Sequence, residues 1–191
     1  MEVTNLLDIR TRHDLRMWYL DNHEKENLFW IRVNRSGKEM PDVIMYLDAV
    51  EEALCFGWID STMKKIDAGY PVQRFTPRRK GGLWTELNKE RCRRLIRLGM
   101  MTPAGEKTLP DMDPDHFVIE EWVLDALKKD DEVWKNFCTF PDAYKRIKLY
   151  HIQRYYEEGF RDNAFAKLEK FITITRKGKM IPGWNDYGRL E

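Results

Sequence analysis

The change in hydrophobic period near Thr85 is the feature that most restricts how this chain can fold. Before it, short runs rich in aromatic and β-branched residues alternate with segments in which apolar residues recur at helical spacing. After it, only the helical spacing remains. A period of two is typical of strands and a period of 3.6 is typical of helices. The sequence therefore predicts an α+β fold, with a small antiparallel sheet packed with helices and followed by a C-terminal helical subdomain.

Three strands are predicted in the first half of the chain. Aromatic and β-branched residues favour strands, and they gather near 27–34, 58–66 and 72–76. The last two runs are separated by the turn residues 68–71, which predicts a hairpin. Pro77 has no backbone donor, so we expect it to end the second hairpin strand.

Three helices are predicted to pack with this sheet, at 11–22, 43–56 and 86–98, because apolar residues recur there every three or four positions. On the helix at 43–56, the acidic residues Asp48, Glu51 and Glu52 fall outside the apolar stripe. We therefore expect these carboxylates to face solvent.

An acidic, proline-bearing stretch at 110–116 is typical of a linker. It separates a predicted core domain of residues 1–109, which carries the CFGWIDS and RFTPRR motifs, from a predicted helical subdomain of residues 117–191. The chain has 33 basic and 32 acidic residues. Because these charges nearly cancel, the net charge gives no argument for a polyanionic partner.

The sequence predicts neither a metal nor a cofactor. The four histidines lack the spacing of metal ligands, and no phosphate-binding glycine loop or nucleophile motif occurs. The isolated cysteines Cys55, Cys92 and Cys138 form no pair typical of a zinc site or a disulfide framework. We expect them to be reduced and buried, as in a cytoplasmic protein.

The N-terminal residues are charged throughout and contain no apolar core of a signal peptide. No run of about 18 apolar residues occurs, so no membrane span is predicted. We expect a cytoplasmic location; the sequence does not predict an oligomeric state.

The stretch from Cys55 to Gly105 holds the candidate binding residues. Guanidinium groups bind phosphates and carboxylates, and an indole offers a stacking plane. The start of the helix after Thr85 would add backbone donors. We predict one pocket for a small anionic or phosphate-bearing ligand, lined by Trp58 or Asp60, Arg74, Arg78, Trp84 and Asn88. A solvated helix face beside a charged loop is the structural alternative.

Two other functions stay open. One is nucleic-acid binding, with Trp84 stacking on a base and cations contributed by Arg78, Arg79, Lys89, Arg93 and Arg97. The other is an enzyme that uses Asp60, although no histidine lies near in sequence to activate Ser61. Asp60 would have no such role if it formed a structural ion pair with Arg74 or Arg78 across the hairpin.

Four motifs, ALCFGWIDS, RFTPRR, WTxLNKER and LIRLGxMTPAG, resemble the bacteriocin-protection family of YdeI and OmpD-associated proteins. The resemblance covers residues 15–107 and extends more loosely to about residue 175, while the segment 151–172 departs from the family's Ala-Lys then Thr-Arg pattern. It implies a soluble bacterial α+β protein linked to stress or antimicrobial-peptide tolerance, with no established reaction or cofactor. It also marks its motif positions as ligand-binding residues: Trp58, Asp60, Ser61, Arg74, Thr76, Arg78, Arg79, Trp84 and Asn88.

Overall fold

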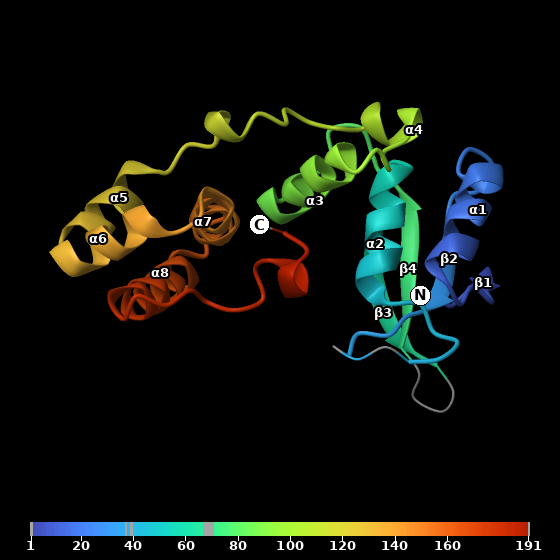
Figure 1. Ribbon diagram of the computed structural model, residues 1–191, viewed down its shortest axis with the longest axis horizontal. Coiled ribbons are helices and arrows are strands. Elements are labelled where there is room, and N and C mark those ends of the chain that lie inside the picture. Colours follow the sequence, from blue (N-terminus) through green and yellow to red (C-terminus); the bar gives the residue numbers. More distant parts are fainter. Residues whose placement is uncertain (1, 37, 39, 67–70, 191) are drawn as a thin grey trace. The chain divides into compact units, whose positions relative to one another are not determined.

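The computed structural model describes residues 2–36, 38, 40–66 and 71–190. The chain divides into two compact units. Unit 1 comprises Met1–Leu83 and Arg91–Asp111, and unit 2 comprises Trp84–Glu90 and Met112–Glu191. All described strands belong to unit 1, and the described elements of unit 2 are helical (Figure 1). The predicted α+β fold class is therefore confirmed.

Unit 1 contains the predicted elements close to their predicted bounds. Its strands are β1 (Leu6–Leu7), β2 (Phe29–Arg32), β3 (Trp58–Lys65) and β4 (Pro71–Pro77). Its helices are α1 (Arg12–Asn22), α2 (Tyr46–Cys55) and α4 (Pro103–Glu106), together with the second half of α3 (Glu86–Arg97). The turn predicted at 68–71 falls mostly on residues 68–70, which lie outside the described residues.

The sheet has the strand order β1-β2-β4-β3. The three predicted strands pair antiparallel, as expected, but β1 adds a parallel pair with β2, so the sheet is mixed. The sequence did not predict β1, because a strand of 2 residues is too short to carry a pattern.

The pairing of β3 with β4 is interrupted by a β-bulge. Asp60 pairs with Phe75, and the next paired residues are Met63 and Gln73. The two residues between them on β3 therefore face a single residue, Arg74. A bulge of this kind leaves one residue unpaired and bends its strand locally.

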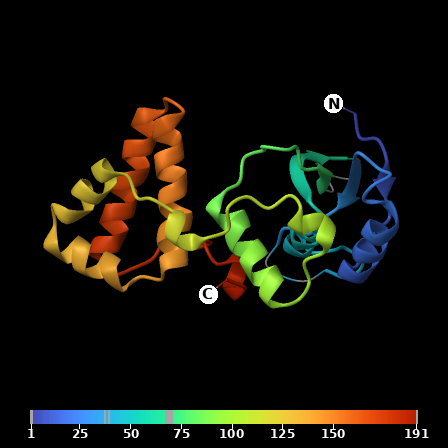
Figure 2. The same ribbon diagram turned by 90° about the horizontal axis from the view of Figure 1, so that it is seen from above.

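One face of the sheet is covered by α1 and α2, which lie on the same side of it (Figure 2). Aromatic rings fill the space between. Trp58 is 1% exposed, and its ring centroid lies 5.5 Å from that of Tyr19 on α1 and 5.4 Å from that of Phe29 on β2. Its indole nitrogen donates to the carbonyl oxygen of His23 at 3.3 Å. These contacts make Trp58 part of the core.

A network of buried charges joins α1 to α2 and corrects one prediction. Glu51 and Glu52 were expected to face solvent, yet they are 1% and 0% exposed. Arg12 donates to Glu51 and to Glu52, at 2.7 Å in each case, and Arg16 donates to Glu52 at 2.9 Å. Arg94 donates to Glu51 at 2.9 Å. Burial opposes the charge of Arg12, but its bonds to the two carboxylates raise its pKa. We call these five residues the arginine network.

Unit 2 holds the remaining helices: α5 (Glu121–Lys128), α6 (Asp131–Thr139), α7 (Asp142–Glu157) and α8 (Arg161–Arg176), with the short 3-10 helices Pro114–His116 and Asp186–Gly188. Its core includes Leu127, Tyr144, Phe171 and Trp184. A short connection joins α7 to α8, which makes them antiparallel neighbours. No strand occurs after residue 117 in the described part, as predicted.

None of the helices in the described ranges is both long enough and apolar enough to cross a membrane.

Candidate functional site

The sheet separates the residues that sequence reasoning placed in one pocket. Residues that pair directly across antiparallel strands share a face. Asp60 pairs with Phe75, and Phe75 pairs with Phe29, so all three lie on the face covered by helices. Arg74 pairs with Trp30 and therefore lies on the opposite face. The predicted arrangement of Asp60 and Arg74 around one ligand is thus wrong.

Asp60 takes part in a chain of polar contacts on the helix-covered face. The hydroxyl of Tyr46, at the start of α2, donates to the Asp60 carboxylate at 2.7 Å. The guanidinium carbon of Arg35 lies 3.6 Å from the centroid of the Tyr46 ring, and Arg35 donates to the side chain of Gln73 at 2.9 Å. Gln73 donates in turn to the carbonyl oxygen of Ser61 at 3.1 Å.

These contacts show a structural use of Asp60 that the sequence did not indicate. The expected ion partners were Arg74 or Arg78, but the hydrogen bond to the Asp60 carboxylate comes from Tyr46, a tyrosine of another element. Burial and the Asp60 carboxylate raise the pKa of Tyr46 to about 12. A phenol with this pKa stays protonated near neutral pH, so Tyr46 remains a hydrogen-bond donor to Asp60.

The opposite face of the sheet brings three predicted residues together. Ser61 and Arg74 meet at the β-bulge, where a guanidinium nitrogen of Arg74 donates to the Ser61 hydroxyl at 3.5 Å. Thr76 lies on the same face as Arg74, two residues further along β4, and pairs with Ile59. We call Ser61, Arg74 and Thr76 the bulge patch.

The bulge patch is open to solvent and carries positive charge. Ser61 is exposed, while Arg74 and Thr76 are half-buried. No carboxylate of a described residue lies within 4.0 Å of the Arg74 nitrogens. The patch therefore presents a guanidinium and two hydroxyls, all of which can donate hydrogen bonds to an anion.

The two arginines that follow β4 differ in their surroundings. Arg78 is half-buried and donates to the carbonyl oxygen of Leu83 at 3.3 Å, a bond that closes the loop between them. Burial lowers the pKa of Arg78 to about 10. Arg79 is exposed. Their binding roles stay predictions.

Trp84 and Asn88 belong to unit 2. Thr85 caps the start of α3, since its hydroxyl accepts from the Asn88 backbone nitrogen at 3.2 Å. The Lys89 ammonium lies 2.8 Å from the buried Glu86 carboxylate. One of the cations assigned to nucleic-acid binding is thus neutralised internally, which weakens that alternative.

Sulfur chemistry and metal binding gain no support. Cys55 and Cys92 are buried as expected, and burial raises the pKa of each thiol to about 12. Cys138 is exposed, contrary to expectation, because its position on α6 points away from the apolar stripe. No group of three or more histidine, cysteine or acidic side chains suited to a metal occurs within the described ranges.

A known protein family matches the part of the chain that forms the sheet and its helices. A family model described as a domain of unknown function (DUF8412) matches residues 7–108, more than half of the 191 residues. The chain belongs to the DUF8412 family. The DUF8412 match includes the whole bulge patch and the arginine network, and it ends before α5. Neither the curated proteins nor the solved structures gave a match.

Proposed function

We propose that unit 1 is a binding module for a small anionic or phosphate-bearing ligand, and that the ligand binds at the bulge patch. The observation that carries this proposal is Arg74, a half-buried arginine whose guanidinium lies beside the Ser61 hydroxyl, with no carboxylate among the described residues within 4.0 Å. A guanidinium in partial shelter gains more from an anion than one in bulk water, because the local dielectric is lower.

The shape of the patch also supports a small ligand. The β-bulge presents Ser61 and its neighbour on β3 opposite Arg74 alone, so donors from two strands converge on one spot. β-bulges are over-represented at sheet edges and next to active sites, where they change the direction of a side chain. The guanidinium fork suits the paired oxygens of a phosphate or a carboxylate.

The resemblance to the bacteriocin-protection family supplies a physiological setting for this proposal. That setting is stress or antimicrobial-peptide tolerance in a bacterial cytoplasm. A binding module without catalysis fits it, since the polar contacts of Asp60 are used within the fold.

A thermal-shift screen of inorganic phosphate, nucleotides, phosphosugars and acidic metabolites tests the proposal. A ligand that binds only the folded state raises its apparent stability by mass action. Arg74→Gln should abolish the shift caused by the ligand and leave the unliganded Tm unchanged. Lys65→Gln, at the far end of β3, is the matched control and should keep the shift. A shift that survives in Arg74→Gln would disprove this site.

Arg78→Ala tests whether the loop after β4 contributes to binding. If Arg78 contacts the ligand, the variant loses the shift while its unliganded Tm changes by only a few degrees. If it unfolds instead, the bond to Leu83 is structural, and Arg78 has no place in the binding site.

A short oligonucleotide separates the proposal from nucleic-acid binding. Released counterions make affinity for a nucleic acid fall steeply with salt. Oligonucleotide binding with a steep dependence on salt, in the absence of any small-ligand shift, would replace the small-anion function with nucleic-acid binding.

A further inference from the structure

A cavity of about 220 Å³ lies in unit 2, between α7, α8 and the segment that follows α8. Its lining combines apolar and cationic side chains. Ile152 and Phe171 are 4% and 0% exposed and, with Ile181, form an apolar floor. Because all of these residues belong to unit 2, the cavity is separate from the bulge patch.

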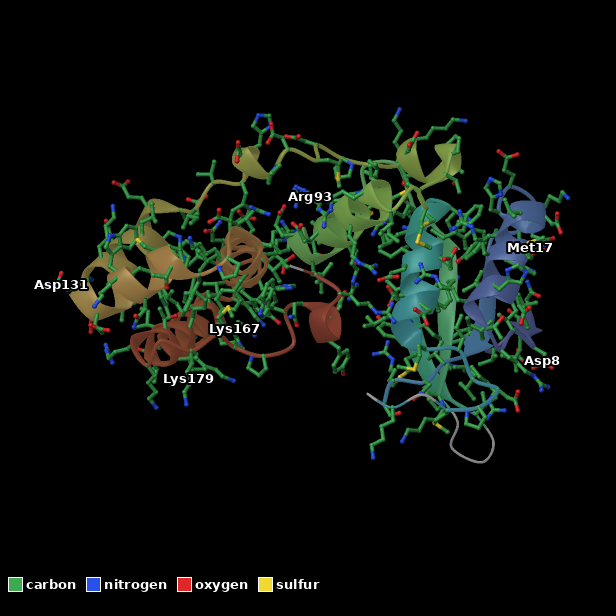
Figure 3. The ribbon with its side chains drawn as sticks, in the orientation of Figure 1. Asp8, Met17, Arg93, Asp131, Lys167 and Lys179 are labelled. Carbon is green, nitrogen blue, oxygen red and sulfur yellow. The ribbon has the colours of Figure 1, made fainter. Side chains whose placement is uncertain are left out.

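Four nitrogen-bearing side chains surround this floor: Lys148 and His151 from α7, and Lys167 and Lys170 from α8. We call them the lysine rim. Each helix contributes its two residues at a spacing of three, which places them on one helical face. Figure 3 labels Lys167 on α8.

The lysine rim has no close counter-charge within the described part of the chain. No carboxylate of a described residue lies within 4.0 Å of a rim nitrogen. Lys148 donates to the carbonyl oxygen of Pro182 at 3.3 Å, and the Lys167 ammonium lies 4.8 Å from the centroid of the Tyr155 ring. These neighbours orient the two lysines without neutralising them.

The rim side chains already interact with one another. Burial, and then the charge of Lys170, lowers the pKa of Lys148. Burial, and then the charges of Lys148 and Lys167, lowers the pKa of His151. An anion placed among these like charges would reduce the repulsion between them.

We propose that this cavity binds a small organic anion, an apolar body that carries a phosphate or carboxylate group. The body lies on Ile152, Phe171 and Ile181, and the anionic group contacts Lys148, Lys167 and Lys170. An apolar pocket with a few convergent polar groups is the usual form of a small-molecule site. The volume limits the buried body to about one aromatic ring or a short aliphatic chain.

Three probes test both halves of this proposal. Phenyl phosphate carries the ring and the anion, phenol carries only the ring, and inorganic phosphate carries only the anion. Binding is followed by calorimetry and by the NMR signals of the His151 ring in the full chain. Phenyl phosphate should bind at least about tenfold more tightly than either fragment, because the two contacts add in one molecule. It should also raise the pKa of His151.

Charge-neutral variants locate the binding. Lys167→Gln and Lys170→Gln should each weaken phenyl phosphate binding by about fivefold or more, since each removes a charge-assisted contact. Lys179→Gln is the matched control. Lys179, which is labelled in Figure 3, is exposed on the segment that follows α8 and is not among the residues that line the cavity. Arg74→Gln in unit 1 should also leave this affinity unchanged, so failure here and failure of the proposed function are distinguishable.

Several results would overturn the proposal. One is that Lys179→Gln weakens phenyl phosphate binding as much as Lys167→Gln and Lys170→Gln do. Binding would then depend only on the net charge of the protein. Another is equal affinity for inorganic phosphate and phenyl phosphate, which would remove the apolar floor from the site. Binding to vesicles that contain phosphatidic acid, without binding of phenyl phosphate, would assign the lysines to a lipid surface instead.

Discussion

In unit 1 the arginines of the arginine network bond to buried carboxylates of the same unit, whereas in unit 2 the lysine rim surrounds a cavity and has no carboxylate of a described residue within 4.0 Å. Arg12 and Arg16 hold Glu52 at 2.7 and 2.9 Å. Lys167 and Lys170 lie beside a space of about 220 Å³. A cation with a partner inside the fold contributes to the fold, and a cation without one is available to a ligand.

The largest effect should come from breaking the arginine network. Glu52→Ala leaves Arg12 and Arg16 partly buried without that carboxylate, and removing one partner of a buried ion pair costs about 3–5 kcal/mol. Urea unfolding followed by tryptophan fluorescence measures the loss. Asp142→Ala in unit 2 is the control, because that carboxylate is 80% exposed in its pair with Lys145 and should cost about 0.5 kcal/mol or less. Equal losses of stability in Glu52→Ala and Asp142→Ala would contradict the expected difference between a buried and an exposed carboxylate.

Two buried tyrosines should respond with opposite signs. The Tyr19 hydroxyl in unit 1 is buried with no hydrogen-bond partner in the described part of the chain. Tyr19→Phe should therefore raise the free energy of unfolding by about 1 kcal/mol. The Tyr144 hydroxyl in unit 2 accepts from the Ile181 backbone nitrogen at 3.0 Å, so Tyr144→Phe should lower it by about 1 kcal/mol. Chemical denaturation of both variants measures these changes. A lower free energy of unfolding in Tyr19→Phe would show that the Tyr19 hydroxyl does have a hydrogen-bond partner.

Removing a rim lysine should stabilise the protein slightly. Lys170→Gln relieves repulsion with Lys148, and we expect a gain of up to about 0.5 kcal/mol at low salt that disappears as salt screens the charges. Arg94→Gln in unit 1 should destabilise, since it removes a partner of Glu51 at 2.9 Å. Thermal unfolding of both variants at two salt concentrations measures these changes in stability. A loss of stability in Lys170→Gln would mean that the rim contributes to the fold.

The smallest effect concerns pH. The folded pKa of His151 lies below its ordinary value of 6.5 because of burial, Lys148 and Lys167, with Lys170 also on the rim. As pH falls below 6.5, the unfolded chain takes up the proton before the folded chain does, so the free energy of unfolding falls. His151→Gln should lack this part of the pH dependence. Unfolding curves between about pH 7.5 and about pH 5 test it, and a constant difference between variant and parent would contradict it.

Helices α1, α2 and α3 and the three longer strands could be predicted from the sequence, because a regular period marks each of them. Gly57 follows the helix that carries Glu51 and is left-handed, with a φ of 74°, a conformation that glycine adopts at helix ends without steric cost. The exposure of Glu51 and Glu52 was predicted wrongly, since a helical pattern shows an apolar stripe but not an arginine on another helix.

The candidate site was predictable only in part. Motif reasoning found Ser61, Arg74 and Thr76, but it could not foresee a bulge, which depends on the pairing of two strands. It also placed Asp60 with Arg74, although their pairing puts them on opposite faces of the sheet. The lysine rim carried no signal at all. Each helix shows two nitrogen-bearing side chains three residues apart, as many solvated helices do, and only the packing of α7 on α8 joins the pairs.

The ends of the sheet affect how this protein behaves in concentrated solution. Outer strands offer unpaired backbone groups to strands of other molecules, and long flat edges cause aggregation. In the described sheet, β1 offers 2 residues at one end. At the other end, β3 is distorted by its bulge and carries Lys64 and Lys65. The distortion that shapes the bulge patch thus also makes this edge a poor template for intermolecular β-pairing.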